Sequence, residues 1–196
     1  GSGPIGLLTM QAARFAGAIE VVATDVEDAP LRAALGSMGA TKVINVAAEP
    51  DGLARYATDG GHFDAAFEVS GSPQALASLF GVVRRGGRIV QLGMMPPGTC
   101  ALPINQLQSR EIDLVGAFRA HDEFRLAVEL ITSGKFDVSP ILSGTFPLDR
   151  AGEAFAQAGH GHRRRGLGGF AVADVAGAGL SGSQTESGQR KSSDGG

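Results

Sequence analysis

Gly1-Ser2-Gly3-Pro4-Ile5-Gly6 opens the chain as a complete G-x-G-x-x-G motif, and an apolar segment with helical spacing follows it at once. In a strand–turn–helix unit, the first glycine permits the tight turn and the second lets the backbone approach a pyrophosphate. The third lets the helix pack closely on the sheet. The strand that normally precedes this turn is not in the sequence, which also starts without Met. We therefore expect a piece of a larger protein, beginning at its nucleotide-binding turn.

Segments with helical and strand patterns alternate behind this motif. We predict helices over 4–16, 29–38, 52–57, 73–83 and 122–133, and strands over 19–24, 42–46, 63–69, 88–92 and 111–118. Strands that alternate with helices of about 10 to 15 residues are typical of a parallel sheet. The expected fold class is α/β, a doubly wound parallel Rossmann sheet whose first strand is missing from the chain.

Composition bounds the function classes. The 196 residues are 43% hydrophobic and 19% charged, which fits one globular domain. A formal net charge of −3 gives no electrostatic reason to expect nucleic acid or a membrane surface as partner. The single cysteine, Cys100, excludes an internal disulfide and a four-cysteine zinc cluster, so we expect a cytoplasmic protein.

The composition changes after residue 158. Residues 159–196 are rich in Gly, Ser, Ala and Arg and show little periodicity. Such a segment offers too little apolar surface to offset the entropy lost on ordering. We therefore predict a folded domain over 1–158 and a low-complexity, disordered tail over 159–196.

Asp25 adds a second feature to the glycine motif. It follows the predicted strand 19–24 and stands 19 residues after Gly6, where an acid can accept both hydroxyls of an adenosine ribose. An acid at this place repels a 2′-phosphate and so favours NAD over NADP. The alternative is that Asp25 only caps the helix that begins near Val26-Glu27-Asp28.

Several stretches occur together in an order that resembles the zinc-type medium-chain dehydrogenases, most closely their polyol branch of sorbitol and L-idonate 5-dehydrogenases. These stretches are GSGPIGLLTMQAARFAGA, VVATDV, FDAAFEVSGSPQAL, RRGGRIVQLGM, REIDLVGAFR and FPLDRAGEAF, within residues 1–158. The resemblance implies NAD-dependent oxidation of a secondary alcohol of a polyol or sugar acid to a ketone. It also implies a homo-oligomer, zinc in a preceding domain, and an inactive isolated chain.

The resemblance also implies which residues contact the cofactor. Val69-Ser70-Gly71 would lie beside a ribose, and Leu92-Gly93-Met94 would present backbone groups to the nicotinamide carboxamide. Phe118-Arg119 would line the nicotinamide and substrate side, and Pro4-Ile5 would lie against the pyrophosphate and the nicotinamide face. The full predicted set is Gly1, Gly3, Pro4, Ile5, Gly6, Asp25, Val69, Ser70, Gly71, Leu92, Gly93, Met94, Phe118 and Arg119. The alternative is a set of strand-end turns in which Gly and Ser only serve the backbone, with Arg119 a solvated charge.

We expect no catalytic residue and no metal ligand in this chain. A catalytic zinc needs three protein ligands such as Cys, His and Glu, which the resemblance assigns to the preceding domain. The potential ligands here are scattered: Cys100, His62, His121, His160 and His162. Asp64 and Glu68 share one face of a predicted strand, but that strand is apolar and no base partner is identifiable.

Two other functions stay open at this stage. The same sheet serves non-catalytic nucleotide-binding modules, and it also occurs in zinc-free quinone reductases. The sequences FEVSG at 67–71 and GAFR at 116–119 resemble the polyol branch and count against the reductases, as does Asp25. An upstream domain bearing zinc ligands would distinguish an enzyme from a binding module.

Overall fold

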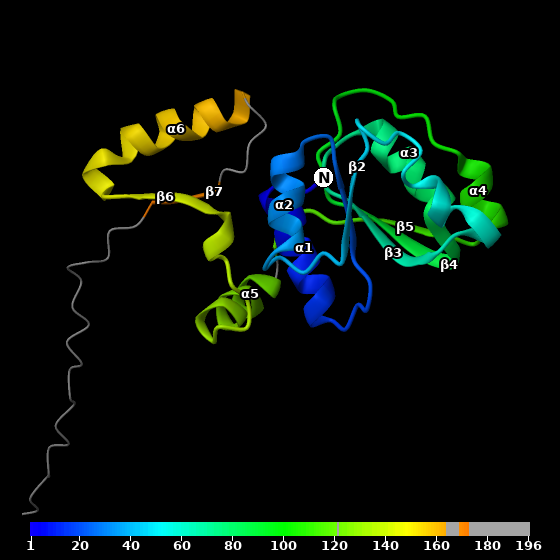
Figure 1. Ribbon diagram of the computed structural model, residues 1–196, viewed down its shortest axis with the longest axis horizontal. Helices are drawn as coiled ribbons and strands as arrows, with labels where there is room; N and C mark the ends of the chain where they lie inside the picture. The colour runs from blue at the N-terminus through cyan, green and yellow to red at the C-terminus, as the bar shows by residue number, and fades with distance from the viewer. Residues whose placement is uncertain (121, 164–168, 173–196) are drawn as a thin grey trace, which may run out of the picture.

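Parallel strands and intervening helices make up the chain, as a computed structural model that describes residues 1–120, 122–163 and 169–172 shows (Figure 1). In one sheet β1 (Val22–Asp25) pairs with β2 (Lys42–Asn45), and in another β4 (Val83–Gln91) lies between β3 (Phe63–Glu68) and β5 (Asp113–Gly116). The helices that connect these strands are α1 (Pro4–Phe15), α2 (Asp28–Leu35), α3 (Pro73–Val82) and α4 (Ile104–Ser109). The predicted α/β class with parallel strands is confirmed.

The two sheets meet beside the start of the chain. Their orders, β2-β1 and β3-β4-β5, follow the doubly wound order 3-2-1-4-5-6 on either side of its first strand. Within the described residues no ladder joins β1 to β3. The Ser2 amide donates to the Asp25 carboxylate at 2.7 Å, and a Cβ on Gly1 would lie 3.0 Å from the Cβ of Ser70. The glycine turn therefore lies between the ends of β1 and β3.

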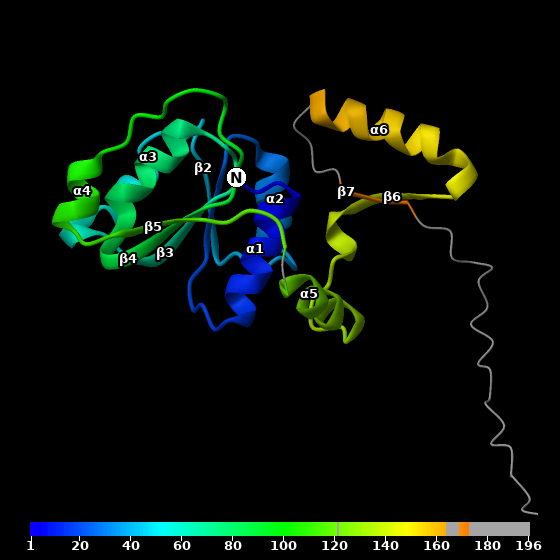
Figure 2. The ribbon, with the colours of Figure 1, turned by 180° about the vertical axis from the view of Figure 1, so that it is seen from behind.

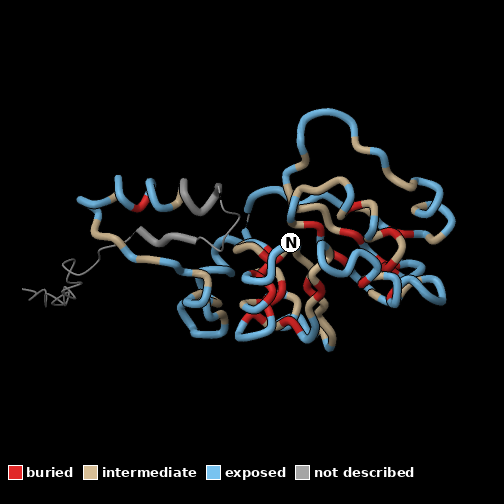
Figure 3. Tube along the Cα trace, turned by 45° about the horizontal axis from the view of Figure 1, so that its top comes forward, coloured by how far each residue is buried: buried red, intermediate tan, exposed pale blue. Residues whose placement is uncertain are grey.

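Three apolar clusters form the core, and Figure 3 shows buried segments on both sides of the N-terminus. The first packs α1 and α2 on β1 through Leu7, Met10, Ala23, Leu31, Ala34, Met38 and Ala40. The second packs α3 on the larger sheet through Ala66, Leu76, Phe80, Val83, Ile89 and Ile112. The third, Ile44, Tyr56 and Val82, joins β2 to the end of α3, and Phe63 of β3 packs against it. Each fully buried large apolar side chain contributes about 1.5–3 kcal/mol, so the third cluster is a substantial link.

Local signals explain where the helices next to the site begin and end. Pro4 begins α1, where its missing N–H costs no helical hydrogen bond, and Gly17 follows the end of the helix with φ 100°. Ser72 caps α3 by accepting a hydrogen bond from the Ala75 amide at 3.3 Å, and Pro73 follows the cap. Both helices thus begin directly after a turn at the end of the sheet.

Some predicted boundaries are wrong. The strand expected over 19–24 begins only at Val22, because the Arg14 guanidinium takes the carbonyls of Ala18 and Ile19 at 2.5 and 2.7 Å. The helix expected over 29–38 ends at Leu35, since Gly36 leaves the helical conformation with ψ −119°.

Three further elements differ in type or length. The helix expected over 52–57 is a pair of short 3-10 turns, η1 (Ala54–Tyr56) and η2 (Thr58–Gly60). The strand expected over 88–92 begins at Val83, and residues 84–87 leave the ladder between its pairings with Phe63 and Ala65. The strand expected over 111–118 is confined to β5.

The rest of the described chain stands to one side of the two sheets in Figures 1 and 2. It comprises α5 (Glu123–Thr132), η3 (Ser139–Ile141), β6 (Leu142–Phe146), η4 (Leu148–Arg150), α6 (Ala151–Arg163) and β7 (Gly169–Val172). Strand β7 pairs in parallel with β6. Within the predicted tail, 159–163 therefore continue α6 and 169–172 form a strand, and the remainder of that prediction lies outside the described residues. In the part of the chain that the structure describes, no helix has the length and apolarity needed to span a membrane.

Candidate functional site

The predicted site segments all lie where strands end. Because parallel strands end at one edge of a sheet, residues that follow them gather at that edge, here called the carboxyl edge. Asp25 ends β1, the turn 69–71 follows β3, the turn 92–94 follows β4, and Phe118 and Arg119 follow β5. Helix α1 begins at the same edge, directly after the glycine turn.

The three motif glycines have different surroundings. A Cβ at Gly6 would lie 2.1 Å from the Gly1 carbonyl oxygen and 3.2 Å from Val69 Cγ2, so the third glycine permits close packing against the end of β3. A Cβ at Gly3 would meet no atom within 4 Å. Gly3 is also the N-cap of α1 and gives its first turn no side-chain cap. Open space at a 12-residue helix N-terminus with free amides fits an anionic group.

Asp25 holds the glycine turn against β1. Its Oδ2 accepts from the Ser2 amide at 2.7 Å, and its Oδ1 accepts from the amides of Val26 and Glu27 at 2.8 and 3.1 Å. The N-cap of α2 is Glu27, so Asp25 does not cap that helix. A carboxylate has about four lone-pair positions, and the remaining one is on Oδ2. Asp25 can therefore accept a hydrogen bond from a ligand beside the glycine turn.

Glu68 forms the most connected polar cluster at the carboxyl edge. This last residue of β3 is 2% exposed. Its Oε1 accepts from the amide of Ser70 at 2.8 Å and from the Ser70 hydroxyl, and its Oε2 accepts from Gly71 N and Gln91 Nε2 at 2.9 Å each. Burial raises the pKa of Glu68, but these hydrogen bonds outweigh it and hold the pKa below its ordinary value. The carboxylate is therefore ionised at neutral pH.

This role of Glu68 is not apparent from its place in a predicted apolar strand without a base partner. Its partners are donors in the turn that follows and on β4. A glutamate with Ser and Gly two and three residues later is a signal that could have identified it, since their amides can reach back to the carboxylate.

The two turns pack backbone to backbone. A Cβ at Gly71 would lie 2.2 Å from the Met94 carbonyl oxygen, and a Cβ at Gly93 would lie 2.2 Å from the Gly71 amide nitrogen and 2.5 Å from Glu68 Oε2. Only glycine fits at either place without moving the main chain. The structure thus brings the predicted turns 69–71 and 92–94 into direct contact.

Phe118 and Arg119 lie at the same edge but are open to solvent. The Ala117 amide donates to the Gln91 carbonyl at 2.9 Å, which fixes this segment beside the end of β4. Phe118 is 71% exposed, and the Arg119 guanidinium carbon lies 4.9 Å from its ring centroid. Arg119 has φ 63°, a strained backbone conformation for a residue other than glycine.

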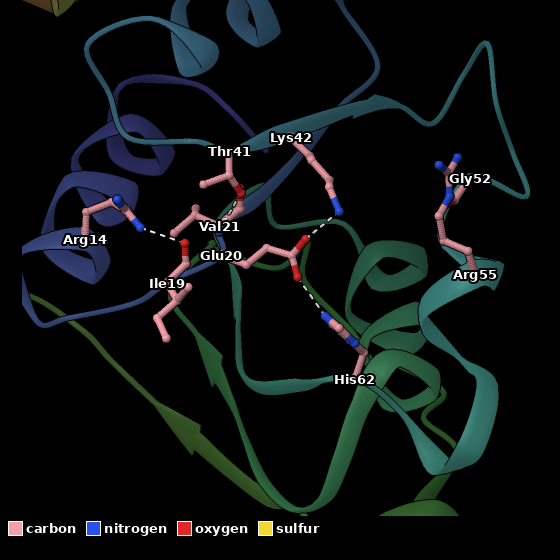
Figure 4. A network of polar contacts seen from close by, with 9 residues as sticks. All are labelled: Arg14, Ile19, Glu20, Val21, Thr41, Lys42, Gly52, Arg55 and His62. Atoms are coloured by element: carbon pink, nitrogen blue, oxygen red, sulfur yellow. Dashed lines mark hydrogen bonds and ion pairs between the residues drawn. The ribbon is translucent and has the colours of Figure 1, made fainter.

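A second polar network lies at the opposite edge, where the strands begin (Figure 4). Glu20 accepts from Lys42 Nζ at 2.7 Å through Oε1, and its Oε2 lies 2.7 Å from His62 Nε2. The residues stand just before β1, at the start of β2 and just before β3, so Glu20 joins the two sheets. His62 belongs to this bridge. In the described residues no group of three or more His, Cys, Asp or Glu side chains could hold a metal ion, so zinc does not fit there.

Comparisons with known proteins show which family the chain belongs to. The family model for zinc-binding dehydrogenases matches residues 4–133. The chain is 37% identical over 161 residues to L-idonate 5-dehydrogenase (NAD(P)(+)) of Escherichia coli (strain K12), covering 81% of this chain and 45% of that protein. It is 34% identical over 161 residues to sorbitol dehydrogenase of Bacillus subtilis (strain 168), with the same coverage of 81% and 45%.

A solved structure of the Escherichia coli L-idonate 5-dehydrogenase matches with a TM-score of 0.75 at 34% identity, covering 85% of this chain and 46% of that one. The chain therefore spans about half the length of the relatives it matches. The family model covers most of the described fold, and its match begins at Pro4, directly after Gly1, Ser2 and Gly3 of the glycine turn. The chain belongs to the zinc-binding dehydrogenases, as their cofactor-binding domain.

Proposed function

We propose that this chain binds NAD in an oxidoreductase that oxidises a secondary alcohol of a polyol or sugar acid to a ketone. The observation that carries the proposal is the joining of the glycine turn to Asp25, with open space at Gly3 and at the N-terminus of α1. The substrate class is supported by the names of two relatives, which act on L-idonate and sorbitol. We expect the whole protein to be a cytoplasmic homo-oligomer.

Each part of the carboxyl edge has a separate task in this proposal. The first amides of α1 hold the pyrophosphate, and Gly3 leaves the space for its approach. Asp25 accepts from the adenosine ribose, and the turn 69–71 lies beside a cofactor ribose. The turn 92–94 and the pair Phe118 and Arg119 line the nicotinamide side. When bound, NAD supplies the hydride acceptor. The predicted backbone contacts of Leu92, Gly93 and Met94 orient the ring against the substrate.

Zinc enters the proposal only through other parts of the protein. It would lower the pKa of the substrate alcohol as a Lewis acid. Because the described residues offer no ligand set, we expect the zinc ligands in a domain outside this chain. We therefore expect this chain by itself to produce no NADH from sorbitol or L-idonate.

Asp25→Ala tests the cofactor assignment. Calorimetric titration of the variant should show NAD binding weakened by about 1–3 kcal/mol, because a charge-assisted hydrogen bond is lost. The gap between NAD and NADP should narrow, since the group that repels the 2′-phosphate is gone. A wild-type chain that already prefers NADP would reject the assignment.

Glu27→Ala is the matched control. It removes the same charge two residues away, at an exposed side chain that makes no cap hydrogen bond to α2. NAD affinity should stay close to that of the wild type. Equal losses in the two variants would mean that net charge, rather than the Asp25 hydrogen bond, governs binding.

A further inference from the structure

We infer that Glu68 is a positioning residue that locks the turns 69–71 and 92–94 together in the geometry that receives the nicotinamide half of the cofactor. The inference rests on the proposed function for the identity of the ligand. Glu68 itself is buried beneath the two turns and acts through them.

Hydrogen bonds connect Glu68 to both turns. The carboxylate accepts from Ser70 and Gly71 in the first turn and from the Gln91 side chain, which also donates to the Gly93 carbonyl at 2.6 Å. The backbone carbonyl of Glu68 accepts from the amides of Leu92 and Gly93 at 2.8 and 2.9 Å. One residue thus fixes both turns, through its side chain and its main chain.

The negative charge of the Glu68 carboxylate matters as well as its contacts. The four donors to the Glu68 carboxylate are neutral groups, and a buried carboxylate without such donors would be strongly unfavourable. A glutamine in its place would offer one acceptor oxygen and would turn an NH₂ group toward other donors. The cluster therefore requires an anion and not only a polar side chain of this size.

The side-chain amide of Gln91 is held in one orientation. Its Nε2 faces two acceptors, Glu68 Oε2 and the Gly93 carbonyl, so a flipped amide would set oxygen against oxygen. In this orientation its Oε1 is buried and has no hydrogen-bond partner among the described residues. A buried unpaired acceptor is unfavourable by about 1–3 kcal/mol. The Glu68 cluster holds Gln91 in place despite that loss, which fits a role in positioning more than one in stability.

The contacts also predict an asymmetric effect on binding. Glu68 contacts the turn 69–71, assigned to a cofactor ribose, and, through Gln91 and its own carbonyl, the turn 92–94, assigned to the nicotinamide. The adenosine ribose is assigned to Asp25, on a different sheet. Loosening the turns should therefore weaken contacts to nicotinamide and spare contacts to adenine. General destabilisation of the fold would weaken both.

Glu68→Gln is the principal variant, and saturation-transfer NMR with NAD and AMP as probes is the measurement, because it detects weak binding. NAD affinity should fall about tenfold, the equivalent of one charge-assisted hydrogen bond, while AMP affinity changes less than about twofold. The signal of the nicotinamide protons should fall relative to that of the adenine protons. Glu68→Asp, which keeps the charge, should recover part of the ratio.

Ser72→Ala is the matched control, because Ser72 lies next to the first turn but its hydroxyl caps α3. It should leave the ratio of nicotinamide to adenine signals unchanged. Signals that fall together in Glu68→Gln would overturn the inference and leave the proposed function intact. A wild-type chain that shows no NAD or AMP signal would overturn the proposed function.

Two measurements keep the inference testable in those cases. Amide exchange without ligand should be faster in turns 69–71 and 92–94 of Glu68→Gln, and unchanged exchange would contradict the lock. If circular dichroism shows that Glu68→Gln does not fold, Gln91→Met cuts the side-chain link between Glu68 and the second turn and leaves the main-chain link in place. It should lower the same NMR ratio, and an unchanged ratio would again count against the inference.

Discussion

Glu68 and Glu20 tie neighbouring strands at opposite edges of the sheets, and they do so by different means. Glu68 is 2% exposed and is held by neutral donors. The Glu20 side chain is 28% exposed, and its partners Lys42 and His62 are 59% and 51% exposed (Figure 4). Lys42 and then His62 lower the pKa of Glu20, whereas hydrogen bonds lower the pKa of Glu68 against the effect of burial.

This contrast indicates which edge of the sheets holds a fixed geometry. Exposed ion pairs are weak and screened by salt, because water and ions compete for both partners. A buried carboxylate with four donors has no such competition and cannot rearrange without leaving donors unpaired. The rigid edge is the one where the proposed cofactor site lies.

The largest effect should come from the edges of β1 and β3, which no ladder joins within the described residues. An N-terminal extension of about eight Val, Ile and Leu residues should pair with both strands and raise the melting temperature and NAD affinity together. A Gly/Ser extension of the same length is the control. Equal melting temperatures for the two extended chains would contradict pairing of the extension with β1 and β3.

Gly93→Ala should be the most damaging substitution of those considered. Its Cβ would lie 2.2 Å from the Gly71 amide nitrogen, so the backbone of two turns must move, at the upper end of about 1–3 kcal/mol. Gly116→Ala is the control, because a Cβ there would meet no atom within 4 Å. Urea unfolding followed by circular dichroism measures both, and similar losses would show that the turns are not tightly packed.

Glu68→Gln should lower the free energy of unfolding by about 1–2 kcal/mol at neutral pH. Since the pKa of Glu68 is lower in the folded state, its ionised form stabilises the fold above the unfolded pKa of about 4.3. That contribution is lost as the pH falls through the folded pKa. The difference between wild type and variant should therefore shrink in acid. If the stability difference between wild type and variant is as large below about pH 4 as at neutral pH, the assignment is contradicted.

Glu20→Gln should lower the free energy of unfolding least among these variants. The loss should vanish at high salt, because the ion pairs of Glu20 with Lys42 and His62 are exposed. Tyr56 is a convenient reporter, since the chain has one tyrosine and no tryptophan and this ring centroid lies 5.2 Å from that of His62. Glu49→Gln is the control, because Glu49 pairs with Arg55 on the surface at 3.4 Å. If the loss of stability in Glu20→Gln persists in molar salt, the Glu20 network is not a weak exposed one, and the contrast with Glu68 is wrong.

Much of the fold could be predicted because its signals are local. The spacing of apolar residues and the proline within the motif predicted α1 nearly to the residue, and β3 and α3 were predicted equally well. The predictions were wrong where a side chain competes for the backbone, as Arg14 does for the carbonyls of Ala18 and Ile19 before β1. Helix α4 was not predicted, since six residues give too short a pattern.

Residue spacing along a few turns of chain is enough to predict that the strands are parallel and alternate with helices, and hence that residues ending the strands share one edge. The contacts of Glu68 with Gln91, 23 residues away, and of Glu20 with His62, 42 residues away, arise only in the folded chain. The burial and partners of a charged side chain depend on which strands become neighbours, and no local pattern encodes that choice.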